Sequence, residues 1–494
     1  MRKAKIVCTI GPASESLDML GRLIEHGMDA ARLNFSHGTH ASHGRAIQAV
    51  REAAAGRKVA VAIIQDVQGP RIRVDEVSEK GLEVAPGQSV RLRTALARSG
   101  GQLAQSGAQG AQIGAAPGGM SDGQIDIPVT YQHLARDVRP GGRILIDDGL
   151  IELTVTRIAG GVVECLVVTG GRILSHKGIN LPGTTVSAPT LTEKDCEDIR
   201  FGVAAGVDYI ALSFVRGPED VKAAKQLVAA CGRDVPIIAK IERVEAVNAL
   251  PAILDAADGV MIARGDLGVE MGAEAVPVLQ KRIIAEANRR RRLVITATQM
   301  LESMTQRASP TRAEASDVAN AVFDGTDAVM LSAETAIGRY PVETVRVMDR
   351  IIRAAEEGIE PSAVRRRDAD GNARSCSEAI CTAASTAAWA ITASAIVAFS
   401  ELGATARLIS KQRPAAPIVA FTPFEPVRQR MALYWGVIPH CMHQIAQTDE
   451  RVHEAERRLK AEGFVKPGER IVILSGTRIG QPGGTNLMKL HEVP

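Results

Sequence analysis

Three ionisable side chains in the middle of the chain have the types and spacing that phosphoryl chemistry needs. The apolar run Val235–Ala239 is typical of a buried parallel strand, and Lys240 and Glu242 follow it two residues apart. Residues two apart on a strand leave the same face. A second apolar run, Gly259–Ala263, leads to Asp266. An ammonium beside two carboxylates suits Mg²⁺ and a phosphoryl group.

Polar side chains also follow the second and third apolar runs. Arg32, Asn34 and Ser36 are spaced by two and can point into one cavity, where an arginine suits bidentate contact with a phosphoryl group. Asn34 and Ser36 are equally compatible with helix capping. Asp66 comes directly after an apolar run, where a carboxylate is costly unless it is paired or bound to a metal.

Hydroxyl side chains end the last two runs. Thr298 and Ser332 could bind a carboxylate or hold a water molecule, although such residues more often only cap the next helix. The histidines at 37, 40 and 43 are spaced by three, but no cysteine or carboxylate with matching spacing accompanies them. We therefore predict no metal at these histidines.

Eight strand-like apolar runs must position these side chains. They are Lys5–Ile10, Asp29–Leu33, Val59–Gln65, Asp208–Ser213, Val235–Ala239, Gly259–Ala263, Leu293–Ala297 and Asp327–Leu331. Helical patterns lie between most of them, as from about Val244 to Leu254. Eight βα units predict an α/β fold of the (β/α)8 TIM barrel type, with a doubly wound sheet as the structural alternative. Five of the eight strand ends carry polar groups that would meet at one barrel mouth.

The third and fourth runs are separated by far more chain than one helix needs. Ile151–Ile158 alternates in polarity, and a two-glycine turn leads to a second strand, Val162–Val168. We predict a small antiparallel β domain inserted into the barrel, with low-complexity residues 99–124 to which we assign no function. The barrel resumes with a helix near Glu193 that Thr192 can cap.

The C-terminal third indicates another α/β domain. A helix from about Pro341 to Ala355 and a charged linker, Glu356 to Arg374, precede three strands near Ala395–Phe399, Pro417–Phe421 and Arg470–Leu474. Two polar loops follow strands there, Ser400–Thr405 and Ser475–Gly484, and could cradle a phosphate, although such loops are more often plain turns. The predicted boundaries are 1–70 and 172–355 for the barrel, 71–171 for the insertion and 356–494 for the C-terminal domain.

Composition limits the class of protein. The chain has 494 residues and a net charge of +3, which is too small to argue for a nucleic-acid partner. Its seven cysteines form no CxxC pair, so we predict neither a disulfide framework nor a zinc site, and a cytoplasmic location. Ala379–Phe399 carries no charge but is mostly Ala, Thr and Ser, and we predict a packed helix and strand rather than a membrane span.

Several long stretches, in this order along the chain, resemble the pyruvate kinase family. They are Ala31–Gly38, Ile237–Glu242, Met261–Glu270, Thr298–Met304 and Leu331–Thr335. The resemblance covers essentially the whole chain. It implies a barrel domain, an inserted β-barrel lid and a C-terminal effector domain, usually in a homotetramer. It also implies transfer of a phosphoryl group from phosphoenolpyruvate to ADP, which gives pyruvate and ATP.

The resemblance implies a role for each matching residue. Glu242 and Asp266 would hold Mg²⁺ (or Mn²⁺), Lys240 would stabilise the phosphoryl group in flight, and Arg32 and Arg73 would bind phosphate. The backbone N–H groups of Gly265 and Asp266 would bind the substrate carboxylate, with Thr298 near the proton path and Ser332 also at the substrate. The nucleotide-binding positions would be Asn34, Phe35, Ser36, His37, Arg73 and Lys177.

Two departures from the family pattern affect ions and effectors. The family's K⁺ site would be Asn34, Ser36, Asp66 and the Val67 carbonyl, but many K⁺-dependent members have an acidic residue where Arg71 stands. We hypothesise that this guanidinium makes K⁺ dispensable. The loop that resembles the sugar-phosphate site is Ser400, Glu401, Leu402, Gly403, Ala404 and Thr405. Because Glu401 would repel a bisphosphate, we expect a sugar monophosphate or AMP as activator rather than fructose bisphosphate.

Two other functions compete with this interpretation. A metal-dependent lyase or aldolase that acts through a pyruvate enolate could use the same Lys240, Glu242 and Asp266, but would not need Arg32 and Arg73. A non-catalytic metabolite sensor would have lost the lysine or a metal carboxylate.

Overall fold

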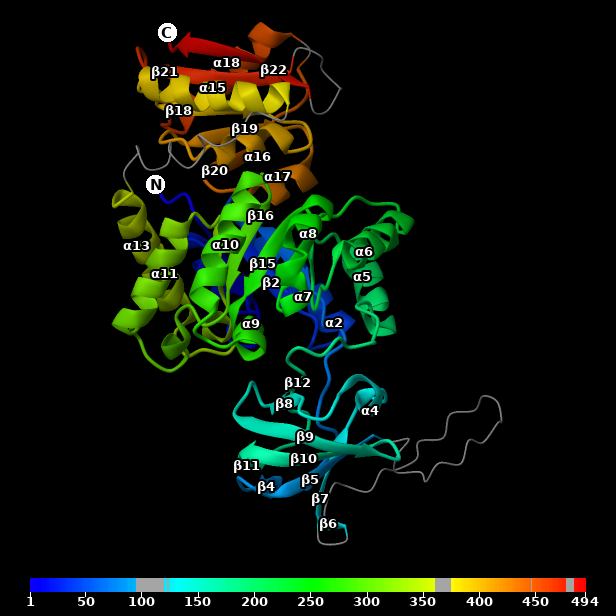
Figure 1. Cartoon of the computed structure of the whole chain (residues 1–494). Helices are drawn as coiled ribbons and strands as arrows, with labels where there is room; N and C mark the ends of the chain where they lie inside the picture. The colour runs from blue at the N-terminus through cyan, green and yellow to red at the C-terminus, as the bar shows by residue number, and fades with distance from the viewer. Residues whose placement is uncertain (95–119, 122–123, 360–374, 446, 477–483) are drawn as a thin grey trace.

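The computed structural model describes residues 1–94, 120–121, 124–359, 375–445, 447–476 and 484–494. Three bodies follow one another along the long axis of the molecule (Figure 1). The barrel lies in the middle, the inserted β domain lies at one end of it, and the C-terminal α/β domain lies at the other. The low-complexity segment 99–124 falls almost entirely outside the described residues.

Eight parallel strands close into a barrel, as the apolar runs predicted. Its order is β1-β17-β16-β15-β14-β13-β3-β2. The strands are β1 (Lys5–Thr9), β2 (Ala30–Asn34), β3 (Ala62–Asp66), β13 (Tyr209–Leu212), β14 (Ile237–Ile241), β15 (Gly259–Ala263), β16 (Leu293–Ala297) and β17 (Ala328–Leu331). Both faces of each strand are buried, which explains why they are continuous apolar runs rather than alternating ones. The doubly wound alternative is excluded.

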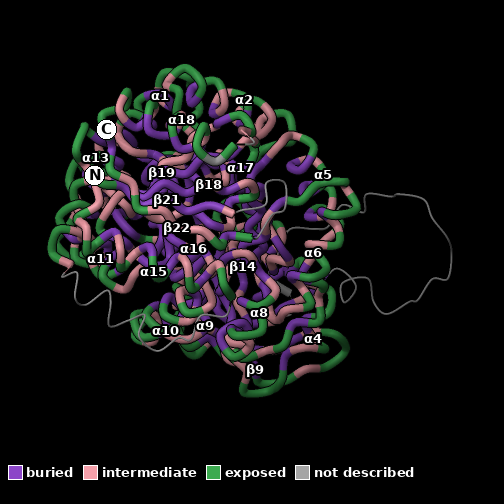
Figure 2. The backbone as a smooth tube through the Cα atoms, turned by 90° about the horizontal axis from the view of Figure 1, so that it is seen from above, coloured by how far each residue is buried: buried purple, intermediate pink, exposed green. Residues whose placement is uncertain are grey.

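Helices surround the barrel and bury its outer face. They are α1 (Leu17–Glu25), α2 (His40–Gly56), α5 (Glu193–Ala205), α6 (Pro218–Ala230), α7 (Val244–Asn248), α8 (Leu250–Ala256), α9 (Arg264–Met271), α10 (Val276–Arg289), η1 (Glu302–Thr305), α11 (Arg312–Asp324), α12 (Ala333–Ala336) and α13 (Pro341–Glu357). Figure 2 shows buried backbone through the interior, with exposed segments on the outer helices. Along β14, Ile238 packs inside the barrel and Ile237 packs outside it, against the helices.

Two predictions for the helices of the barrel, one of a helix cap and one of a helix span, had different outcomes. Thr192 caps α5 as predicted, in a reciprocal capping box with Asp195. The single helical segment expected from Val244 to Leu254 is instead two helices, α7 and α8, because Pro251 lies in the first turn of α8 and has no N–H to continue the α7 ladder.

The inserted domain is a seven-stranded sheet with a separate two-stranded ribbon. Its elements are β4 (Leu82–Val84), β5 (Ser89–Thr94), β6 (Met120–Ser121), β7 (Gln124–Val129), α4 (Leu134–Asp137), β8 (Arg143–Ile146), β9 (Ile151–Ala159), β10 (Val162–Thr169), β11 (Gly171–Ile173) and β12 (Ile179–Asn180). The predicted β9–β10 hairpin is present. Val74 bridges to Val129 in β7 and Arg73 to Gly178 beside β12, so these bridges draw the two sides of the sheet together.

A five-stranded sheet forms the C-terminal domain. Its elements are α15 (Cys376–Ala390), β18 (Ala395–Phe399), α16 (Ala404–Lys411), β19 (Ile418–Thr422), α17 (Glu425–Met431), β20 (Val437–Cys441), α18 (Thr448–Ala461), β21 (Arg470–Gly476) and β22 (Thr485–Glu492). The three predicted strands are present, whereas β20 and β22 were not predicted. The uncharged segment from Ala379 forms part of α15 and then β18, as expected, and no helix in the described part of the chain could span a membrane.

The C-terminal domain covers the amino ends of the barrel strands. Lys5 Nζ in β1 donates to the Val437 carbonyl at 2.9 Å, and the Tyr209 hydroxyl donates to the Arg430 carbonyl at 2.9 Å. Glu356 belongs to α13 rather than to the predicted linker, because its carboxylate accepts the N–H groups of Lys3 and Ala4. The carboxyl ends of the strands therefore face the inserted domain.

Candidate active site

Lys240 lies at the centre of a buried charge cluster at the carboxyl end of the barrel. Its Nζ lies 2.8 Å from Glu242 Oε1 and 3.2 Å from Asp66 Oδ1. It also donates to Ser213 Oγ at 2.8 Å. Lys240 and Glu242 project from the end of β14, whereas Asp66 ends β3, so the closed barrel brings together residues far apart in sequence. Ser213, which ends the fourth predicted run, was not singled out from sequence.

The protonation of this cluster follows from burial and mutual charge. Burial alone would lower the pKa of Lys240, but Asp66 and Glu242 outweigh it and raise the pKa overall. Burial raises the pKa of Glu242, with Lys240 opposing and Asp266 reinforcing the rise. Burial would raise the pKa of Asp66, yet Lys240 and Arg32 lower it overall. The charged forms of Lys240 and Asp66 are therefore favoured, and a further cation beside Glu242 would favour the charged form of that carboxyl as well.

Arg32 reaches the same cluster from β2. Its Nε donates to Asp66 Oδ2 at 2.7 Å, and one terminal nitrogen donates to Thr9 Oγ1 at 3.1 Å. The side chain is only 12% exposed, so this ion pair is shielded from solvent. Asp66 is thus held by two cations, which explains why a carboxylate is tolerated directly after an apolar strand.

The first turn of α9 supplies backbone donors and a second carboxylate. Ala263, at the N-cap, offers no side-chain cap, and the Gly265 N–H donates instead to Thr298 Oγ1 at 2.9 Å. Asp266 lies in the same turn, and its charge contributes to the raised pKa of Glu242. A helix amino terminus favours anions, so this turn suits a substrate carboxylate beside the Glu242 and Asp266 oxygens.

Thr298 adopts a backbone conformation that is rare for a β-branched residue. Its φ is 68°, in the left-handed region, directly after β16. The buried Arg264 guanidinium donates to the Thr298 carbonyl at 2.7 Å and holds the turn in place. Such strain is typical of functional sites, where the surrounding structure over-determines the geometry.

Ser332 carries a hydroxyl that needs a partner. Among the described residues, its buried Oγ has no hydrogen-bond partner, whereas its backbone N–H donates to Glu334 Oε2 at 2.6 Å. A buried hydroxyl usually finds a partner, so this one suits a ligand at the mouth.

A cleft separates the barrel mouth from the inserted domain. Asp266 and Phe214 line it from the barrel, and Ile72, Ile179 and Asn180 line it from the insertion. The Phe214 N–H donates to Glu242 Oε2 at 2.7 Å, so the cleft opens beside the charge cluster. Asp266 lies in the first turn of α9, so an anionic ligand in this cleft would lie beside the amino terminus of that helix.

Comparison with known proteins identifies the family. A family model described as "Pyruvate kinase, barrel domain" matches residues 1–345, and one described as "Pyruvate kinase, alpha/beta domain" matches residues 378–491. The chain belongs to the pyruvate kinase family. It is 43% identical over 500 residues to a pyruvate kinase of Sporosarcina psychrophila, covering 100% of this chain and 81% of that protein. It is 40% identical over 496 residues to that of Clostridium perfringens, covering 100% of both.

A solved structure supports the same assignment. The crystal structure of a pyruvate kinase from Cryptosporidium parvum matches with a TM-score of 0.90 and 35% identity. The match covers 100% of this chain and 96% of that one. The barrel, the insertion and the C-terminal domain are therefore the pyruvate kinase architecture.

Only part of the segment 34–37, which is expected to bind nucleotide in a pyruvate kinase, is accessible to a ligand. His37 is exposed, and Asn34 Oδ1 accepts the Ser36 N–H at 3.2 Å. The Phe35 ring is 2% exposed and stacks on His43 with centroids 3.9 Å apart, so the ring itself packs in the core. His40 lies against Asp198 at 2.7 Å.

Two predicted nucleotide ligands lie on the insertion. Arg73 donates to the His176 carbonyl at 2.9 Å, and Lys177 Nζ lies 2.9 Å from Asp147 Oδ1. Arg73 bridges to Gly178, the residue after Lys177, so both side chains come from the chain next to β12 of the pyruvate kinase insertion. Arg73 and Lys177 are therefore separated by the cleft from residues 34–37 of the barrel, the other expected nucleotide ligands.

The predicted K⁺ ligands already have protein partners. Asp66 binds Arg32 and Lys240, and the Val67 carbonyl accepts the Ser213 hydroxyl at 2.6 Å. Arg71 lines the cleft, with its guanidinium 3.8 Å from Asp148 Oδ1. Within the described part of the chain, Arg71 forms no hydrogen bond or ion pair with the proposed K⁺ ligands.

The predicted effector loop follows β18 and begins α16. Ser400 Oγ accepts the Thr405 N–H at 3.1 Å, so this hydrogen bond joins the two ends of the loop. Gly403 has a φ of 83° at the N-cap of α16, a conformation that favours glycine. Thr405 Oγ1 lies 2.6 Å from Thr485 Oγ1, and Leu402 is 58% exposed.

Proposed function

We propose that this chain catalyses transfer of the phosphoryl group of phosphoenolpyruvate to ADP, giving pyruvate and ATP. The observation that carries the proposal is the buried Lys240 ammonium, 2.8 Å from Glu242 and beside the first turn of α9 at the barrel mouth. Phosphoryl transfer depends on alignment and charge neutralisation more than on covalent chemistry, and this arrangement supplies both.

Each step of the reaction has a candidate group. A terminal phosphate oxygen of ADP attacks phosphorus, and the bond from phosphorus to the enol oxygen breaks. Lys240 stabilises the phosphoryl group, and the Gly265 and Asp266 amides hold the carboxylate of the substrate. The enolate then takes a proton on its methylene carbon from the Thr298 side, which gives pyruvate. Ser332 and Arg32 complete the substrate site.

The family implies a divalent cation, and the donor set fits one. Glu242 and Asp266 are oxygen donors of the kind Mg²⁺ or Mn²⁺ prefers. Burial, reinforced by Asp266, raises the pKa of Glu242 despite the Lys240 ammonium, so a further cation there would favour the charged carboxylate. When bound, the cation would neutralise charge on the carboxylate, enol oxygen and phosphoryl group. The insertion acts as a lid that brings Arg73 and Lys177 to the nucleotide and excludes water.

The remaining assignments belong to the same proposal. The barrel and the insertion divide at 70–71 as predicted, and they divide again after β12, which ends at Asn180, rather than at the predicted 171–172, because β11 and β12 pair with strands of the insertion. The C-terminal domain begins after α13, which ends at Glu357, rather than at 355–356. The enzyme is a cytoplasmic homotetramer, and Ser400–Thr405 binds a sugar monophosphate or AMP. K⁺ is dispensable because Arg71 supplies a fixed positive charge at the cleft, without touching Asn34, Ser36 or Asp66 in the described part of the chain.

The decisive experiment is a coupled assay of ATP formation from phosphoenolpyruvate and ADP, with and without Mg²⁺. We expect ATP only when the metal is present. A lyase or aldolase would instead cleave or condense carbon chains and form no ATP, and a metabolite sensor would bind phosphoenolpyruvate without turnover.

A further inference from the structure

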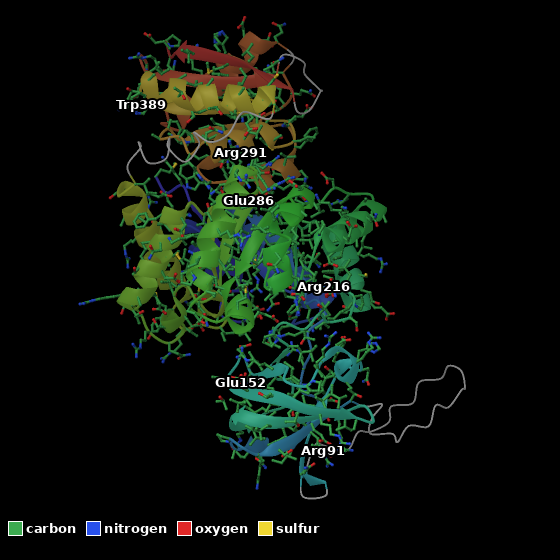
Figure 3. All side chains as sticks on the ribbon, in the orientation of Figure 1. Arg91, Glu152, Arg216, Glu286, Arg291 and Trp389 are labelled. Atoms are coloured by element: carbon green, nitrogen blue, oxygen red, sulfur yellow. The ribbon has the colours of Figure 1, made fainter. Side chains whose placement is uncertain are left out.

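The chain that leaves the lid and re-enters the barrel lies on charged barrel side chains. This return segment, residues 181–190, connects β12 to α5. Arg243 donates to the Thr184 carbonyl at 2.8 Å. Arg216 donates to the Val186 carbonyl at 2.6 Å and to Thr190 Oγ1 at 2.9 Å. Figure 3 places Arg216 on the part of the barrel nearest the lid.

The same segment is also fixed to the lid. The backbone N–H and the hydroxyl of Ser187 both donate to Asp137 Oδ2, at 2.8 and 2.9 Å. Asp137 ends the lid helix α4. The return segment therefore contacts both bodies, the barrel at Thr184, Val186 and Thr190 and the lid at Ser187.

Arg243 and Glu270 link this segment to the metal-binding elements. Arg243 directly follows Glu242, and Glu270 lies one turn after Asp266 on α9. Their side chains are 9% and 3% exposed, with 3.9 Å between Arg243 Nη1 and Glu270 Oε1. Glu270 also forms a hydrogen bond with the Gly183 backbone in the return segment.

The pair is not fully satisfied in this conformation. Glu270 Oε2 is buried and has no hydrogen-bond partner among the described residues. The Arg243 contacts to Glu245 are long, at 3.3 Å each.

We propose that Arg243 and Glu270 are positioning residues that latch the return segment of the lid to the strand end and helix carrying Glu242 and Asp266. The latch sets how the lid presents Arg73 and Lys177 to the nucleotide. This inference rests on the lid and metal assignments proposed above. It concerns nucleotide capture rather than the chemistry at Lys240.

The test compares Arg243→Ala and Arg216→Ala with wild type in two reactions. ATP formation needs the lid and ADP, whereas exchange of the methyl protons of pyruvate with deuterium, followed by NMR with Mn²⁺ or Mg²⁺ and inorganic phosphate, needs only the barrel site. We expect KM for ADP to rise about tenfold in each variant, the equivalent of one lost charge-assisted hydrogen bond. Methyl-proton exchange and Mn²⁺ affinity should stay at wild-type values.

Controls separate the latch from general damage. Arg289→Ala removes an exposed barrel arginine and should change neither reaction. If Arg243→Ala does not fold, Arg243→Lys keeps the cation but cannot contact Thr184 and Glu270 together, and carries the same expectation. The latch proposal would be overturned if KM for ADP were unchanged in Arg243→Ala and Arg216→Ala. It would also be overturned if a loss of Mn²⁺ affinity accounted for the change in KM. Absence of ATP formation by the wild type would instead overturn the proposed function.

Discussion

The Lys240 ammonium lies 2.8 Å from Glu242 Oε1, so the cation that we propose for phosphoryl transfer and a carboxylate that we propose for the metal form one buried ion pair. Replacing Lys240 by Met removes positive charge where the phosphoryl group passes but leaves Glu242 and Asp266 in place. We expect kcat for ATP formation to fall by at least about 10²–10³-fold, with Mn²⁺ affinity retained. Lys222→Met, at an exposed lysine paired with Glu219, is the control and should be fully active.

Potassium dependence tests the role of Arg71. Because Asp66 is already neutralised by Arg32 and Lys240, and Arg71 adds charge at the cleft, we expect equal activity in Na⁺ and K⁺ buffers. Arg71→Glu should make activity depend on K⁺. Strict K⁺ dependence of the wild type would contradict the hypothesis.

Effector titration at low phosphoenolpyruvate tests the loop Ser400–Thr405. AMP or a sugar monophosphate should raise activity, and fructose bisphosphate should not. Glu401→Gln removes the repelling carboxylate, so the variant should respond to fructose bisphosphate at lower concentrations than wild type. If fructose bisphosphate activated the wild type, and AMP and sugar monophosphates did not, Glu401 would not determine which effector binds.

Glu270 should make stability depend on pH. Burial, reinforced by Glu245 and Asp266 and opposed by Arg243, raises its pKa from 4.5 to about 7. Between these values the folded state holds a proton that the unfolded state has released, so stability falls as pH rises through this window. The cost above pH 7 is at most about 3 kcal/mol, from about 1.36 kcal/mol per pKa unit.

Glu270→Gln removes this titration. In EDTA, we expect Tm of the variant to exceed that of wild type at about pH 8 and the difference to shrink at about pH 5, where Glu270 is protonated. Glu219→Gln, at an exposed glutamate, should give a Tm difference that does not change with pH. A Glu270→Gln difference independent of pH would contradict the assignment.

The parts of the fold that sequence predicted are those in which one local pattern decides the structure. All eight barrel strands were found because each is a short run buried on both faces. β20 was missed because Pro439 and His440 interrupt an otherwise apolar run, and β22 because it is a half-exposed antiparallel edge strand.

The site was predictable where its residues follow a strand, and not where they depend on a distant partner. Spacing alone placed Lys240 and Glu242 on one face, but it could not show that Arg32 neutralises Asp66 or that Ser213 joins them. Arg243 and Glu270 were missed for the same reason, since their significance lies in Gly183 and Thr184 of the return segment.

Thr298 offers a test of stored strain. A left-handed φ costs a β-branched residue about 1–2 kcal/mol, which Thr298→Gly relieves. The variant loses the hydrogen bond from Gly265, worth about 1 kcal/mol, and adds about 0.5–1 kcal/mol of backbone entropy in the unfolded chain. The gain and the losses nearly cancel, so Tm should hardly move while kcat falls by about 10²-fold as the hydroxyl is lost. Thr298→Ser keeps the hydroxyl and should retain most activity.

Thr296 provides the matched comparison two residues away. Its side chain is fully buried in β16 and its hydroxyl contacts Thr326 Oγ1 at 3.0 Å, with no left-handed φ to relieve. Thr296→Gly should therefore destabilise the protein by roughly 2–3 kcal/mol, from lost packing and backbone entropy. If calorimetry showed equal losses of Tm for the two glycine variants, the Thr298 backbone would store no strain that glycine can release.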